Sequence, residues 1–143
     1  MLTITAGTHT AARAGYTIAK NGSTKNNTLT ITDGTVGAAY GGWTAGTGTT
    51  AAAKFDSTNN TVNLKAGTVR TVYGGFTDAA GGKAHKNTVT INNGGTANNV
   101  TVARASLITN GAGNVRIDAV NNHITATGGT LNNGALVGRA YID

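Results

Sequence analysis

The sequence predicts an all-β protein, a β-solenoid of about five coils with roughly 27–35 residues in each. Three observations predict it: a segment that recurs along the chain, an alternation of apolar and polar residues inside each copy, and a composition poor in bulky side chains. Of 143 residues, two are Phe, one is Trp and one is Met, whereas 22 are Gly and none is Pro. Such a chain cannot fill a wide globular core, but the thin core of a solenoid needs only small and β-branched side chains.

The recurring segment is clearest at residues 60–77, which read NTVNLKAGTVRTVYGGFT, and at 27–44, which read NTLTITDGTVGAAYGGWT. The two match in residue type at almost every position without a gap. Shorter copies give repeats that start near residues 2, 29, 62, 89 and 124. We therefore predict one solenoid over residues 1–143, and we expect it to be a fragment of a longer array because the chain begins and stops inside strand patterns.

Each copy opens with a short strand in which apolar residues alternate with polar ones, as in a half-buried strand. The apolar pairs are expected to face inward as two columns: Leu2 and Ile4, Leu29 and Ile31, Val62 and Leu64, Val89 and Ile91, Ile124 and Ala126. The outward column between them would be Thr3, Thr30, Asn63, Thr90 and Thr125. A Gly follows each of these strands, where the chain has to bend.

A second strand then leads to Tyr-Gly-Gly in two of the copies. Arg13 stands where Tyr40 and Tyr73 stand in the other copies. Because an unpaired Arg is very costly in a narrow apolar core, this position is expected to face outward. Arg13, Tyr40 and Tyr73 are therefore the candidate ligand-binding residues. Three residues further on, each of these three copies has an aromatic residue, which we expect to pack against the core or a coil corner: Tyr16, Trp43 and Phe76.

Loops of varying length separate the copies, and possible third strands lie at 53–56 and 114–118. Each loop ends in Asn-Asn or Lys-Asn just before the next copy. Asn tolerates the left-handed conformation, and stacked Asn side chains can bond from coil to coil. We therefore expect a structural ladder of Asn27, Asn60, Asn87 and Asn122. Some of these sites also fit an N-glycosylation sequon, but the Lys86-Asn87 pair keeps the Asn without the sequon, which favours the ladder.

The composition indicates no chemistry. The chain has no Cys, its acidic residues are five Asp, and its three His fall in different repeat registers, so we expect no catalytic residue, no cofactor and no metal site. The net charge is +6, but the cations are scattered without a basic run, so we expect no nucleic acid as partner. No apolar run is long enough to span a membrane, and the first residues of the sequence lack the charged and apolar regions of a signal peptide. We expect no membrane insertion of this segment.

Segment 60–77 resembles the Gly-rich repeats in passenger domains of bacterial autotransporter (type V secreted) adhesins and haemagglutinin-like surface proteins. The resemblance covers residues 27–95 well and the rest loosely. It implies a right-handed, single-stranded parallel β-helix that is extracellular or on the bacterial cell surface, held there by a translocator domain outside these residues.

Three classes of function remain open. The first is a non-catalytic adhesin or stalk segment that binds a host glycan or surface protein. The second is an ice-binding solenoid that uses the outward Thr column, although Asn63 interrupts it. The third is a fragment of a carbohydrate-active β-helix of the phage tailspike or lyase kind, which the missing carboxylates disfavour. Uncovered strand edges at both ends also predict self-association end to end.

Overall fold

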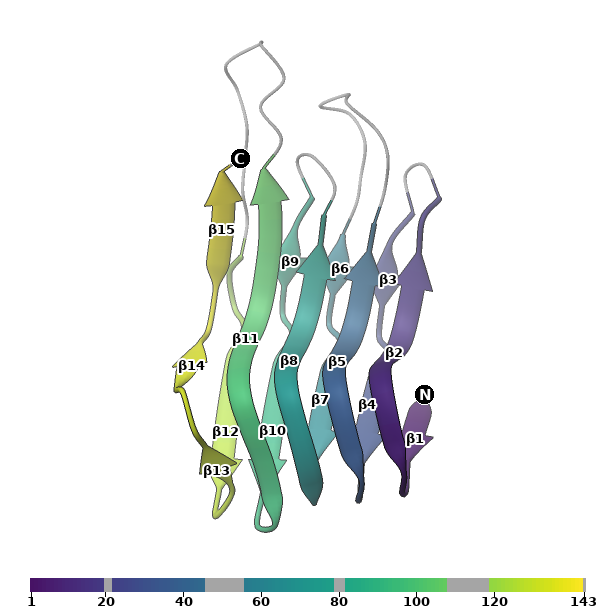
Figure 1. The fold of residues 1–143 in the computed structure, drawn as a ribbon. Coiled ribbons are helices and arrows are strands. Elements are labelled where there is room, and N and C mark those ends of the chain that lie inside the picture. Colours follow the sequence, from purple (N-terminus) through teal and green to yellow (C-terminus); the bar gives the residue numbers. More distant parts are fainter. Residues whose placement is uncertain (20–21, 46–55, 79–81, 108–118, 143) are drawn as a thin grey trace, which may run out of the picture.

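The computed structural model describes residues 1–19, 22–45, 56–78, 82–107 and 119–142, and all its named elements are β-strands (Figure 1). The strands form three sheets, and every pairing between named strands is parallel. The first sheet runs in the order β1 (Leu2–Ile4), β4 (Thr28–Ile31), β7 (Thr61–Leu64), β10 (Thr88–Asn92) and β12 (His123–Thr127). The all-β class with parallel sheets is thus confirmed, and the arrangement is consistent with a parallel β-helix.

The second sheet holds the long strands, which lie in front in Figure 1. They are β2 (Thr8–Thr17), β5 (Thr35–Thr44), β8 (Gly67–Thr77) and β11 (Gly95–Leu107). Three short strands pair with β11: β13 (Thr130–Leu131), β14 (Ala135–Leu136) and β15 (Arg139–Ile142).

A small third sheet, absent from the sequence prediction, joins β3 (Thr24–Lys25), β6 (Ser57–Thr58) and β9 (Ala84–His85). Of the third strands that were expected, 114–118 and most of 53–56 lie outside the described residues. Asp56 is described, and it precedes β6.

The core consists of the predicted inward columns. Leu2, Leu29, Val62, Val89 and Ile124 follow one another in register, and the same holds for Ile4, Ile31, Leu64, Ile91 and Ala126. In the middle copies these side chains are fully buried, together with Val36, Val69 and Val72 from the second sheet. The inward columns are therefore confirmed in the middle copies, whereas Ala126, at the end of its column, is exposed. Val, Leu and Ile supply the largest fully buried side chains, as a thin solenoid core requires.

Left-handed residues end the loops between copies. They are Asn26, Asn59, Lys86 and Asn121, with φ of 58°, 55°, 57° and 56°. Each is the first residue of its pair, so the ladder residue that follows it does not itself have positive φ. Asn is favoured at such a position because its short polar side chain tolerates the left-handed region.

The second asparagine of each pair takes part in a hydrogen-bonded ladder through the interior. The Nδ2 of Asn27 donates to Asn60 Oδ1 at 2.9 Å. In the same way Asn60 donates to Asn87, and Asn87 donates to Asn122, both at 3.2 Å. The backbone N–H of each residue donates to the same oxygen of the next residue, at 3.0–3.1 Å. Asn60 and Asn87 are fully buried, so these bonds satisfy groups that would otherwise be costly to bury.

The ladder also explains the Gly-Gly pairs of β5 and β8. A Cβ on Gly42 would lie 2.5 Å from Asn60 Nδ2, and one on Gly75 would lie 2.3 Å from Asn87 Nδ2. Only glycine leaves the ladder its space. In the next strand Ala103 stands in register with Gly75, at the less regular end of the repeat.

Candidate functional site

The candidate ligand-binding residues lie side by side on the outer face of the second sheet. Arg13 pairs in register with Tyr40, and Tyr40 with Tyr73. Three residues further along the same strands, Tyr16, Trp43 and Phe76 are also in register. Rings of both columns contact one another, and we call the five together the aromatic surface: Tyr16, Tyr40, Trp43, Tyr73 and Phe76.

Two consecutive glycines place both columns on one face. Strict alternation would put residues 40 and 43 on opposite sides of the strand. However, Gly41 and Gly42 both approach Asn60. A Cβ on Gly41 would lie 3.2 Å from the Asn60 Cβ, and one on Gly42 would lie 2.5 Å from the Asn60 Nδ2. Since two successive residues lie on the ladder side, Trp43 returns to the side of Tyr40.

The rings form a continuous stack with edge contacts. Tyr40 is stacked on Tyr73 with centroids 5.0 Å apart and 12° between the planes, and it is stacked on Trp43 at 4.8 Å and 25°. Phe76 presents an edge contact to Tyr73 at 5.0 Å, and Tyr16 one to Trp43 at 5.4 Å. These distances fall in the range in which aromatic pairs add stability beyond their buried area.

The Tyr16, Trp43 and Phe76 column, predicted to pack against the core or a coil corner, is buried at Phe76 and more exposed at Trp43 and Tyr16. Tyr16 is 53% exposed and Trp43 is half-buried. Phe76 is buried, but its ring contacts are with Tyr40, Trp43 and Tyr73 on the outer face. Tyr40 and Tyr73 are half-buried, because they cover one another.

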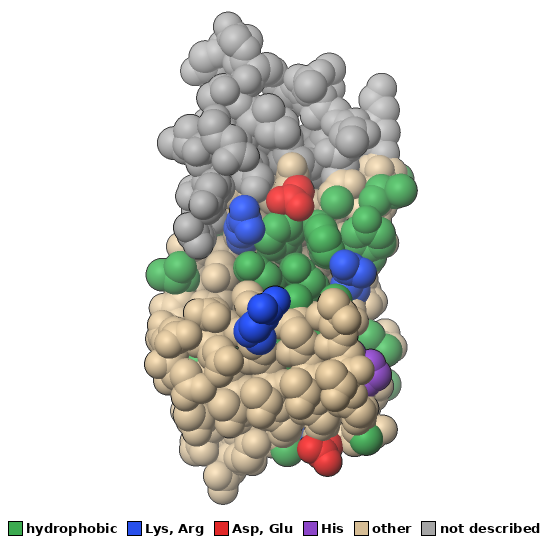
Figure 2. Space-filling model, in the orientation of Figure 1, with side chains coloured by type: hydrophobic (Ala, Val, Ile, Leu, Met, Phe, Trp, Pro, Cys, Tyr) green, Lys and Arg blue, Asp and Glu red, His purple; other side chains and the backbone are tan. Residues whose placement is uncertain are grey.

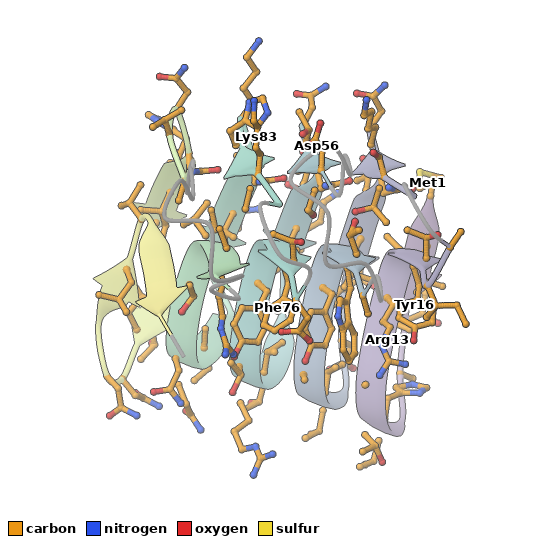
Figure 3. The ribbon with its side chains drawn as sticks, turned by 90° about the horizontal axis from the view of Figure 1, so that it is seen from above. Met1, Arg13, Tyr16, Asp56, Phe76 and Lys83 are labelled. Atoms are coloured by element: carbon orange, nitrogen blue, oxygen red, sulfur yellow. The ribbon has the colours of Figure 1, made fainter. Side chains whose placement is uncertain are left out.

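An arginine lies at each end of the aromatic surface. The guanidinium of Arg13 is 4.5 Å from the centre of the Trp43 ring and 5.3 Å from that of Tyr16. The guanidinium of Arg104 is 4.8 Å from the centre of Phe76, whose strand position it matches in register. Figure 3 shows Arg13 beside Tyr16, with Phe76 further along the row of strands. In Figure 2 the apolar side chains on this face gather between Lys and Arg side chains.

The pKa of the Tyr40 phenol is raised above its ordinary value, first by burial and then by the neighbouring Tyr73 and by Asp78. Arg13 and Arg104 act in the opposite direction. Tyr40 therefore stays neutral near pH 7, and its hydroxyl keeps its capacity both to donate and to accept hydrogen bonds.

An open groove of about 480 Å³ adjoins the aromatic surface on the side of Tyr73. Its other walls come from Thr71, Asn99 and Thr101 and from the 133–136 segment. Asn133 Nδ2 donates to Asn99 Oδ1 at 3.3 Å, and Asn99 Nδ2 donates to the Arg70 carbonyl at 3.2 Å. The groove thus combines one aromatic wall with amide and hydroxyl groups, a lining typical of small polar ligand sites.

The described residues contain no group of three or more His, Asp or Glu side chains that could hold a metal ion. They also contain no helix long and apolar enough to cross a membrane.

Sequence reasoning found Arg13, Tyr40 and Tyr73 and missed their neighbours. The recurrence of an aromatic residue at 16, 43 and 76 was the available signal, but it was interpreted as packing against the core or a coil corner and not as part of the outer face. Arg104 also resembles Arg13 by sequence, since both precede Ala, yet the register sets Arg104 against Phe76 and puts Thr101 opposite Tyr73. The groove beside Tyr73 had no sequence signal, because it depends on this register.

In comparisons with known proteins, no family model, no curated protein and no solved structure matches the chain.

Proposed function

We propose that this chain is a non-catalytic, extracellular or cell-surface repeat module that binds a host glycan through the aromatic surface. The observation that carries the proposal is the meeting of five aromatic rings and Arg13 on one outer face of the longest sheet. A contiguous apolar patch on a protein surface marks an interaction site, and sugar rings pack their C–H groups against aromatic rings.

The proposal includes the finer architecture that the autotransporter resemblance implies. In it, about five coils wind with the right hand as a single-stranded parallel β-helix, and the chain is a segment of a longer adhesin or stalk in an autotransporter passenger. The in-register stacking of strands from successive repeats supports this, because every repeat then shows the same outer face to the surroundings.

A glycan array probed with the purified chain tests the proposed activity. Wild-type protein is expected to retain a defined group of glycans, and Tyr73→Ala and Tyr16→Ala to lose most of that signal. Thr35→Ala is the control, because Thr35 is exposed on the same sheet but outside the aromatic surface. Circular dichroism establishes that the variants fold. An array without reproducible hits, or one in which both tyrosine variants bind as the wild type does, contradicts the proposal. Capture of a host surface protein without its glycans contradicts it too.

Ice binding remains a second candidate because of one column in the second sheet. Thr8, Thr35, Thr68, Thr96 and Thr130 are in unbroken register, and all but the half-buried Thr96 are exposed. Flat threonine columns are what an ice surface would contact. Inhibition of ice recrystallisation that disappears in Thr35→Tyr would favour this candidate, and no inhibition would remove it.

A further inference from the structure

We infer that the groove beside Tyr73 holds one sugar ring of an acidic oligosaccharide, and that the oligosaccharide continues along the aromatic surface toward Arg13. This inference rests on the proposed function and adds a ligand class and a binding subsite, the groove beside Tyr73, which we call the seat. Neither the groove nor the preference for an acidic ligand follows from the aromatic surface alone.

The seat is a missing ring in the tyrosine column. Along the second sheet this column reads Arg13, Tyr40, Tyr73, Thr101 and Leu136 in successive strands. Tyr40 is stacked against Tyr73, but the next position holds the short Thr101 instead of another ring. The groove lies there, with Tyr73 as one wall, Thr101 in its lining and Leu136 on the other side.

The dimensions of this seat match a single ring. Tyr73 and Leu136 are two strand spacings apart, which is about 9.6 Å. Stacked rings in this protein have centroids 4.8–5.0 Å apart, so one ring fits between the two walls. A sugar ring has the C–H faces to pack on Tyr73 and on the exposed Leu136, which is 49% accessible. Asn99, Asn133 and Thr71 line the groove beside them and present the amides and hydroxyl that sugar hydroxyl groups bind.

The charge on this face favours an acidic ligand. Arg13 is exposed, and its guanidinium packs on Trp43, an arrangement that leaves the in-plane N–H groups available to a carboxylate. Arg104 lies three residues after Thr101 on β11, and its guanidinium packs on Phe76. Asp78 contributes a negative charge near Tyr40, whereas Arg13 and Arg104 contribute positive ones.

The separation of the two arginines suits a short oligosaccharide. Across the sheet, Arg13 on β2 and Arg104 on β11 are three strand spacings apart, about 14 Å, and Arg104 lies three residues further along the strand direction, which adds about 10 Å in that direction. One strand spacing is close to the length that one sugar adds to an extended chain, so successive coils can meet successive sugars. Single-stranded nucleic acid also combines charge with flat rings. The faces of Tyr40 are already covered by Tyr73 and Trp43, however, which leaves no series of open platforms for consecutive bases. The inferred oligosaccharide needs only one open ring face, that of Tyr73 in the groove.

The experiment compares two probes of equal length by calorimetry: a hyaluronan hexasaccharide, which alternates glucuronate with N-acetylglucosamine, and chitohexaose, which has no carboxylate. Wild-type protein is expected to bind the acidic probe and to bind the neutral one at least about tenfold more weakly. Arg13→Gln should reduce this preference, whereas Lys25→Gln removes the same charge on the third sheet and should preserve it.

Thr101→Tyr tests the seat itself. It restores the ring that Tyr40 and Tyr73 have in the same column, so the fold should accept it, and it fills the groove. Affinity for the acidic probe should fall at least about tenfold. Thr35→Tyr adds the same ring outside the groove and should bind normally. Melting curves for both variants, together with Tyr73→Ala, separate a filled seat from a misfolded protein.

The outcomes distinguish this inference from the proposed function. Equal affinity for both probes overturns the acidic class, and unchanged binding by Thr101→Tyr and Tyr73→Ala overturns the seat. In either case glycan binding itself stands. Binding of neither saccharide, or of a single-stranded oligonucleotide alone, overturns the inference, and the glycan array then decides whether the proposed function fails with it.

Discussion

At the scale of single residues, the face on which a side chain lies decides what a substitution costs. Leu64 is fully buried between Ile31 and Ile91 in its column, whereas Thr30 lies between Thr3 and Asn63 on the outside of the same sheet. Leu64 and Thr30 belong to neighbouring coils and lie on opposite faces of the sheet. They therefore provide a direct test of the core assignment.

Leu64→Ala is expected to lower the free energy of unfolding by about 2–5 kcal/mol, because it leaves a cavity in a thin core that has little material with which to refill it. Leu64→Asp should prevent folding, since it buries an unpaired carboxylate. Thr30→Asp should change stability by no more than about 0.5 kcal/mol. Urea titrations of the three variants measure this. Similar losses for Leu64→Ala and Thr30→Asp would mean that the faces are reversed.

Tyr40 should couple stability to alkaline pH. Its pKa is raised above the ordinary value of 10.0, chiefly by burial, so the folded protein holds the phenolic proton more tightly than the unfolded chain does. The stabilisation is then complete below about pH 10 and is lost as the pH rises through the raised pKa. Tyr40→Phe should flatten this decline, and Tyr16→Phe, which keeps Tyr40, should retain it. Melting temperatures measured across the alkaline range provide the comparison, and identical profiles for all three proteins would contradict the coupling.

At the scale of elements, the asparagine ladder and the glycine pair act as one unit. Asn87 Nδ2 occupies the space that a Cβ on Gly75 would need, and the three nearest atoms to that Cβ all belong to Asn87. Asn87 also donates to the Ser57 carbonyl and to Asn122 Oδ1. Its side chain therefore links residues of neighbouring coils. The strands β5 and β8 therefore approach the ladder at positions that have no side chain.

A double-mutant cycle tests this coupling. Gly75→Ala alone is expected to cost about 1–3 kcal/mol through overpacking, and Asn87→Ala alone about as much by leaving buried partners unpaired. Together they should cost less than the sum by at least about 0.5 kcal/mol, because the methyl group enters the space that the amide has left. Denaturant unfolding measures all four proteins of the cycle. Strict additivity would show that the glycine is present for another reason.

At the scale of the whole molecule, the sheets end in strands that have a neighbour on one side. β1 and β2 are the outermost strands at one end, and β12 and β13 end the corresponding orders at the other. Unpaired strand edges pair readily with other edges, and near the second end Leu136 and Val137 are exposed as well.

We expect the chain of residues 1–143 to associate end to end, with the last strands of one molecule pairing with the first strands of the next. Sedimentation velocity should show species that grow with concentration, and Thr3→Pro, which removes a strand donor at the β1 edge, should suppress them. Thr125→Pro at the β12 edge should act in the same way, whereas Thr35→Ala should not. A monomer at millimolar concentration would contradict this expectation.

The sequence by itself determined the faces of the short strands, the repeat and the four ladder asparagines. Alternation with a period of two assigns Leu29 and Ile31 to one face whatever the neighbours are, and in-register stacking follows once each copy repeats the same pattern. Asn27, Asn60, Asn87 and Asn122 could be found because each occurs just before a strand of known type.

Only the tertiary structure decided the form of the aromatic surface. The side on which Trp43 lies depends on two successive glycines approaching the buried Asn60, a contact between segments that alternation within one strand cannot predict. The position of Arg104 against Phe76, and the space that Thr101 leaves beside Tyr73, depend on how strands from repeats of unequal length align. Such features arise from pairing between coils, and each strand's own pattern carries information about its faces but none about its partner's register.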